Sequence, residues 1–125
     1  MTQLELGLLD ERFAICRLPA GSPLPDWFAP GPLASATWTE DELSILTLEA
    51  DVPPDARAER GWRVFKVVGP LDFALTGILA SMATPLAEAG ISIFALSTYD
   101  TDYVLVPEGR LEGATRVLGS RFRLS

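Results

Sequence analysis

The second half of the chain alternates between strand-like and helix-like hydrophobic patterns. Residues 62–68, WRVFKVV, are rich in β-branched and aromatic side chains, which favours a β-strand. From Leu71 to Leu86 apolar residues recur mostly at spacings of three and four, which predicts one apolar helical face. We expect the helix to begin at Pro70, where the missing N–H has no cost, and to be capped by Gly90.

Two further apolar runs, ISIFALST and YVLVP, lie on either side of a polar segment around Asp100 and predict a β-hairpin. A second helical pattern covers residues 108–119, and residues 121–125 are expected to form a closing strand. The predicted order is therefore β-α-β-β-α-β. This order is typical of the ferredoxin-like α+β fold, in which an antiparallel sheet carries both helices on one face.

The first half repeats this order in shortened form. The pattern predicts strands within residues 4–9 and 12–19, then a proline-rich connection, then a hairpin over residues 33–49. An acidic segment with two adjacent prolines leads into the second half. We therefore expect two tandem ferredoxin-like modules, residues 1–60 and residues 61–125, the first of which is abridged.

Charge and hydropathy exclude several classes of protein. No apolar run approaches the roughly 20 residues that a membrane-spanning helix needs, and the N-terminus lacks a basic start, so we expect a cytoplasmic protein without membrane contact. Ten Lys and Arg stand against 17 Asp and Glu, which gives a net charge of −7. Nucleic-acid binding usually depends on a basic face, so we expect no nucleic-acid partner.

The residue types that are absent limit the chemistry further. The chain has no histidine and no asparagine, so it cannot build a Ser-His or Cys-His nucleophile pair or a histidine-containing metal site. The single cysteine, Cys16, lies in an apolar run, where a buried side chain is favoured over a reactive thiol. We expect no catalysis, no cofactor and no metal.

Two segments remain as candidates for ligand binding. The junction VVGPLDF, residues 67–73, is expected to present the free N–H groups of a helix start, which suit a carboxylate; the simpler interpretation is helix initiation with a capping Asp72. Ser92 and the segment TYDTD form the second candidate. Asp100 and Asp102 could hold a cationic group, although Asp and Thr are also ordinary turn formers. A pair of carboxylates acting as acid and base has no apolar pocket to support it.

The segment ISIFALSTYDTDYVLVPEGRLEGA resembles the ACT-domain subgroup that includes the CASTOR arginine sensors. The resemblance continues upstream through VVGPLDFALTGILASMATPLAEAG. It reaches the first half through LELGLLDERFAICRL and TWTEDELSILTLEADVP. It implies tandem ACT modules that bind amino acids or other small effectors without catalysing a reaction.

In that family the ligand lies where the first strand–helix loop of one module meets the second strand of another. The resemblance implies strand contacts from Ser92 and Ile93, and a contact between Asp102 and a cationic ligand group. The loop contacts that it implies are Gly69, Pro70, Leu71, Asp72 and Phe73. The arginine sensors carry four modules and this chain two, so we expect the site to form across a homodimer.

The sequence thus favours an ACT-type regulatory protein whose ligand is a free amino acid. One alternative is a module that binds no ligand and uses the same fold for dimerisation or protein interaction. A carboxylate-dependent enzyme is the third interpretation, which the absence of histidine disfavours.

Overall fold

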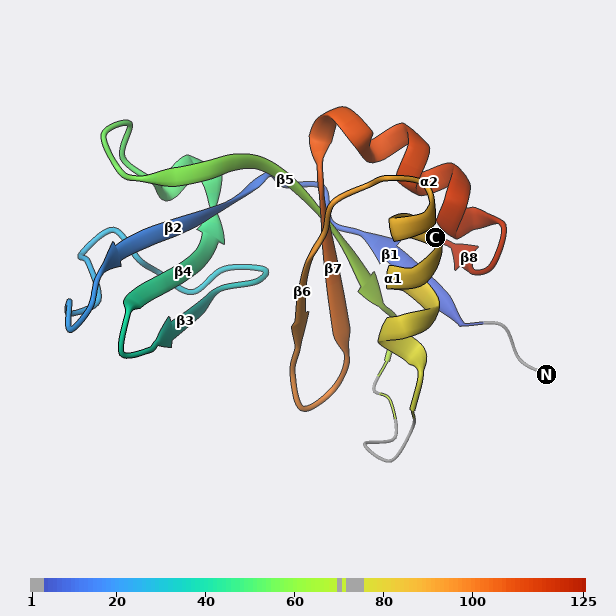
Figure 1. Ribbon diagram of the computed structural model, residues 1–125, viewed down its shortest axis with the longest axis horizontal. Helices are drawn as coiled ribbons and strands as arrows, with labels where there is room; N and C mark the ends of the chain where they lie inside the picture. The colour runs from blue at the N-terminus through green and yellow to red at the C-terminus, as the bar shows by residue number, and fades with distance from the viewer. Residues whose placement is uncertain (1–3, 70, 72–75) are drawn as a thin grey trace. The chain divides into compact units, whose positions relative to one another are not determined.

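A computed structural model describes residues 4–69, 71 and 76–125 of the chain (Figure 1). The chain divides into two compact units, which are described separately. One is formed by residues 11–62 and is called the hairpin unit. The other, called the helical unit, combines the residues up to Asp10 with residues 63–125. The strand at residues 58–67 contributes to both.

The helical unit contains both α-helices. Its elements are β1 (Glu5–Leu8), the second half of β5 (Ala58–Val67), α1 (Ile78–Glu88), β6 (Phe94–Ser97), β7 (Asp102–Pro107), α2 (Leu111–Gly119) and β8 (Arg123–Leu124). A short 3-10 helix, Glu108–Arg110, leads into α2. From β5 onward the order is β-α-β-β-α-β, which confirms the predicted ferredoxin-like order.

Both helices pack on the same face of the sheet of this unit. Val104 and Val106 alternate along β7 and are fully buried, as is Val67 on β5. They form one core with Met82 of α1 and Leu118 of α2. The apolar face of each helix therefore packs against the apolar face of the sheet. This follows from the repeat of about 3.6 residues in a helix and of two residues in a strand.

An additional strand enters this sheet from the N-terminus. β1 pairs antiparallel with β5, with Leu6 opposite Val67, and parallel with β8, with Leu6 opposite Leu124. Leu6 has no exposed surface and belongs to the helical core. The sheet of the helical unit is therefore mixed, with one strand more than the four that the β-α-β-β-α-β order supplies.

The first helix begins later than the sequence pattern predicts. α1 starts at Ile78, and Gly77 precedes it with a left-handed φ of 79°; Leu71 lies outside the helix. The prediction of a helix start at Pro70 is therefore wrong, although residue 70 itself lies outside the described residues. The predicted C-terminal cap is confirmed. Gly90 has a φ of 74°, and the N–H of Ile91 donates to the carbonyl of Leu86, as in a Schellman motif.

The hairpin unit is an antiparallel sheet. Its strands are β2 (Phe13–Pro19), β3 (Ser35–Trp38), β4 (Glu42–Leu48) and the first half of β5, in the order β3-β4-β2-β5. A 3-10 turn, Glu49–Asp51, follows β4. The predicted hairpin is therefore confirmed as β3 and β4.

One face of this sheet carries the core of the hairpin unit. Cys16 of β2 and Ile45 of β4 are paired in the register and buried. Trp27 and Phe28 of the proline-rich segment pack against this core, and so does Ala56 of the segment before β5. Irregular segments thus pack on the core here, where helices do so in the helical unit.

Candidate functional site

The polar segment TYDTD joins the end of β5 instead of standing free as a hairpin tip. Thr101 is 4% exposed, and its hydroxyl donates to the carbonyl of Val67 over 2.7 Å. The N–H of Leu71 donates to the carbonyl of Asp100 over 2.8 Å. Two segments that were separate candidates in the sequence, the junction after β5 and the hairpin tip, therefore form one structure.

Gly69 lies where these two segments come closest. A Cβ at this position would lie 3.0 Å from the backbone nitrogen of Leu71 and 3.3 Å from the carbonyl oxygen of Asp100. Both neighbours are backbone atoms held by the hydrogen bond between them, so they cannot simply move aside. A side chain here would separate the junction from the hairpin tip, and glycine permits the close approach.

A pocket of about 170 Å³ opens beside this contact. It is lined by Lys66, Gly69, Thr98, Asp100, Thr101 and Tyr103. Lys66 is the only lysine in the chain, and its Nζ lies 5.9 Å from the centre of the Tyr103 ring, within cation–π range. The pocket thus combines one cationic side chain, one carboxylate and three hydroxyl groups.

The charges of this pocket match a small molecule that carries both signs. An ammonium such as that of Lys66 attracts a ligand carboxylate, and the carboxylate of Asp100 attracts a ligand cation. No group of three or more potential metal-binding side chains occurs in the described part of the chain. None of its helices is long and apolar enough to cross a bilayer.

Comparison with protein families decides the class of the chain. The model of the ACT domain matches residues 57–120, which is just over half of the sequence. The chain belongs to the ACT domain family. A second family model, which describes an N-terminal domain, matches residues 11–55, nearly the whole of the hairpin unit.

Curated relatives of this ACT protein include amino-acid sensors. The human protein "Cytosolic arginine sensor for mTORC1 subunit 1" is 43% identical over 61 residues, and the rat protein of the same name is 38% identical over 61 residues. Each match covers 48% of this chain and 18% of the relative. The matched part is therefore less than a fifth of these larger proteins.

Solved structures resemble the chain over nearly its whole length. Protein Atu0741 from Agobacterium tumefaciens matches with a TM-score of 0.92 and 38% identity, over 100% of this chain and 94% of that one. The regulatory subunit of aspartate kinase from Thermus thermophilus matches with a TM-score of 0.62 and 14% identity, over 94% of this chain and 98% of that one. The second match supports the fold alone.

Of the implied ACT loop residues, the structure describes Gly69 and Leu71. Gly69 lines the pocket, and Leu71 is bonded to the hairpin tip. Pro70, Asp72 and Phe73 lie outside the described residues. Because α1 begins at Ile78, the free N–H groups of its first turn are not at Gly69. A carboxylate beside Gly69 would meet Lys66 instead of the helix start that we expected there.

The implied strand residues lie away from this pocket within one chain. β6 and β7 pair from Ser97 opposite Asp102 to Phe94 opposite Leu105. Ser92 therefore lies beyond the end of the hairpin that is remote from Asp102, and its side chain is exposed. Ile93 packs against the helical core. Any contact of these two residues with a ligand beside Gly69 would require a second copy of the chain.

The two aspartates of TYDTD have different surroundings. The carboxylate of Asp102 accepts a hydrogen bond of 2.6 Å from the hydroxyl of Ser97, and Asp102 is not among the residues that line the pocket. Asp100, for which the sequence left open a contact with a cationic group or simple turn formation, does line it. Sequence reasoning also missed Lys66 and Tyr103. The sequence feature that could have identified Lys66 is that the only lysine of the chain lies within an apolar strand pattern.

Proposed function

We propose that this chain is a non-catalytic regulatory protein of the ACT type that binds a free amino acid. It acts in the cytoplasm without a cofactor and forms a homodimer through its ACT modules. The family membership supports the regulatory class. The sensing of arginine by the curated relatives, as their name states it, supports an amino acid as the ligand.

The observation that carries the proposal is the hydrogen-bonded contact between the end of β5 and the hairpin tip. It sets Lys66 and Asp100 around one small pocket. Lys66 would hold the ligand carboxylate and Asp100 its ammonium, and charge-assisted hydrogen bonds of this kind are stronger than neutral ones. Thr98 would add a neutral hydrogen bond.

We further propose that the complete site lies at an interface between modules or subunits. Ser92 and Ile93 of a second copy would approach the junction after β5 of the first. The residues that we assign to the complete site from the family pattern are Gly69, Pro70, Leu71, Asp72, Phe73, Ser92, Ile93 and Asp102. The hairpin unit would serve as the abridged first module of the tandem.

A thermal-shift screen of the full chain against the twenty amino acids tests this function. A ligand present at 100 times its Kd stabilises the folded state by about 2.7 kcal/mol, which is readily detected. At least one amino acid should raise the melting temperature. Sedimentation of the same samples should show a dimer in its presence.

The variant Lys66→Gln separates specific binding from a general effect of solutes. Loss of one charge-assisted contact should raise the Kd of the ligand by about tenfold or more. Arg116→Gln is the matched control, since it removes one exposed cation of α2 whose side chain is 75% accessible and which, among the described residues, pairs only with Glu112 of the same helix. If no amino acid shifts the melting temperature at millimolar concentration, the proposed ligand class is wrong. Equal shifts in wild type and Lys66→Gln would refute the site.

A further inference from the structure

A second pocket lies in the hairpin unit, and most of the residues that line it alternate with those of the core of that unit. Side chains alternate along β2, so that Cys16 faces the core while Ile15 and Arg17 face the other way. Arg17 is paired with Ser44 of β4 in the register, and Ile15 with Glu59 of β5. This second face therefore carries Arg17, Ser44 and Glu59, whereas Leu46, the β4 partner of Ile15, is apolar and buried.

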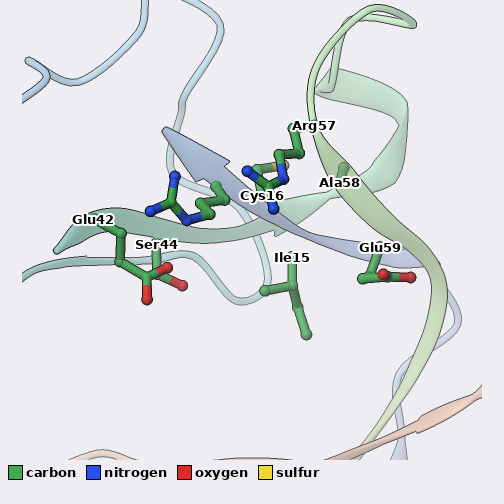
Figure 2. Close-up of a pocket in the computed structure, with 8 residues that line it drawn as sticks. Ile15, Cys16, Glu42, Ser44, Arg57, Ala58 and Glu59 are labelled. Atoms are coloured by element: carbon green, nitrogen blue, oxygen red, sulfur yellow. The ribbon is translucent and has the colours of Figure 1, made fainter. Parts of the chain in front are cut away.

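These side chains surround a hollow of about 240 Å³ (Figure 2). Its lining comes entirely from the hairpin unit and consists of Ile15, Cys16, Arg17, Glu42, Ser44, Arg57, Ala58 and Glu59. Drug-sized ligands occupy pockets of roughly 300 Å³ and above, so this hollow suits a smaller metabolite. It shares no residue with the pocket beside Gly69.

Two arginines are held next to each other at this hollow. The backbone N–H of Arg17 donates to the carbonyl of Arg57 over 3.0 Å, which fixes the two residues side by side. One guanidinium nitrogen of Arg17 donates to the carbonyl of Asp41 over 3.0 Å. The guanidinium of Arg57 makes no hydrogen bond or ion pair with any residue that the structure describes. Its planar set of donors is therefore available to an anion.

Two carboxylates lie on either side of the cationic groups. Figure 2 shows Glu42 beside Ser44 at one side of the hollow and Glu59 at the other, with the side chain of Arg57 between them in this view. Neither carboxylate is hydrogen-bonded or ion-paired within the described ranges. Both signs of charge are thus presented unpaired in a chain whose net charge is −7.

We propose that this hollow is a second ligand site, which takes a small zwitterion the size of a free amino acid. Arg17 and Arg57 hold its carboxylate, for which the guanidinium fork is the best-matched side chain. Glu42 or Glu59 holds its ammonium, and Ile15 supplies the apolar floor. The four charged side chains sum to zero, so a neutral zwitterion leaves no charge uncompensated. The site is independent of the ACT-type site proposed above.

An NMR titration of the uniformly ¹⁵N-labelled full chain tests this site. Each of the twenty amino acids is added up to about 10 mM, a concentration that detects millimolar binding. At least one should shift the amide signals of Ile15, Arg17 and Ser44. Acetate and methylammonium serve as probes that carry only one of the two charges. Each should shift these signals far less than the amino acid does.

Four variants locate the binding. Arg57→Gln should weaken it by about tenfold or more, Arg57→Lys should weaken it less, and the control Arg116→Gln should leave it unchanged. The double variant in which Glu42 and Glu59 are both replaced by Gln should weaken the binding of the amino acid and leave the binding of acetate unchanged.

Each other outcome overturns the site. Shifts confined to residues 66–71 and 98–103 would refute this second site while supporting the ACT-type one. Shifts at Ile15 that survive Arg57→Gln would show that the arginine does not bind the ligand. Acetate binding as tightly as the amino acid would show that the glutamates do not contribute. Absence of any shift in both regions would refute both proposals.

Discussion

The hydroxyl of Thr101 holds the hairpin tip to the end of β5, and its removal should destabilise the helical unit measurably. The bond to the carbonyl of Val67 is 2.7 Å long, a typical distance for an O–H donor, and Thr101 is 4% exposed. Thr101→Val keeps the branched shape but removes the donor. The carbonyl that remains loses this partner in a buried position, which costs about 1–3 kcal/mol.

This cost corresponds to a clear thermal shift. A chain of this size loses roughly 4 °C of melting temperature per kcal/mol, so Thr101→Val should melt about 4–12 °C lower. The matched control is Thr37→Val, the same substitution on an exposed position of β3. Its hydroxyl makes no hydrogen bond within the described ranges, so its effect should stay within about 0.5 kcal/mol.

The assay can follow the two units separately. Both α-helices belong to the helical unit, so far-ultraviolet circular dichroism at the helix band reports that unit. All three tryptophans, Trp27, Trp38 and Trp62, lie in the hairpin unit, so their fluorescence reports the other. Thr101→Val should lower the transition seen by circular dichroism. Equal melting of Thr101→Val and Thr37→Val in that signal would refute the reasoning.

Two further predictions concern titratable groups. Burial raises the pKa of the Cys16 thiol, and the charge of Arg60 offsets this only in part. Native protein at mildly alkaline pH should therefore react slowly with a thiol reagent and fully only in denaturant; rapid native labelling would contradict its burial. Hydrogen bonds from Arg123 and Ser125 hold the pKa of Glu5 below its ordinary value of 4.5. The stabilisation from Glu5 is complete above pH 4.5 and is lost as the pH falls through the lowered pKa. The melting-temperature difference between wild type and Glu5→Gln should shrink on acidification, and a constant difference would exclude this pair as a source of acid sensitivity.

The sequence pattern predicted the elements of the helical unit well because local signals set them. The left-handed Gly90 marks the end of α1, and the apolar run around Val104 marks a buried strand. The helix start was misjudged because Leu71 continues the helical spacing. Its N–H donates instead to the carbonyl of Asp100, a contact that depends on residues far along the chain. Gly77, whose φ is positive, immediately precedes the helix and was the local sign of the true helix start, whereas Pro70 suggested an earlier one.

Pairing between distant segments was beyond sequence reasoning. The apolar pattern of β1 is compatible with a strand in either unit. Only its pairing with β5, in which Leu6 lies opposite Val67, assigns β1 to the helical unit. The pocket beside Gly69 had the same difficulty. Asp100 and Lys66 are 34 positions apart, and their joint presence in one pocket depends on the hydrogen bond from Thr101 to Val67.

The position of β1 between β5 and β8 has a consequence for synthesis. The backbone of Arg123 donates to Leu4, and that of Ser125 donates to Leu6, so this strand has one neighbour made about 60 residues later and another made more than 110 residues later. Once residues 11–62 have emerged from the ribosome, every strand of the hairpin unit is available for pairing. The first strand must wait unpaired with β8 until residue 124 emerges. We therefore expect the hairpin unit to fold during translation and the helical unit to close only afterwards.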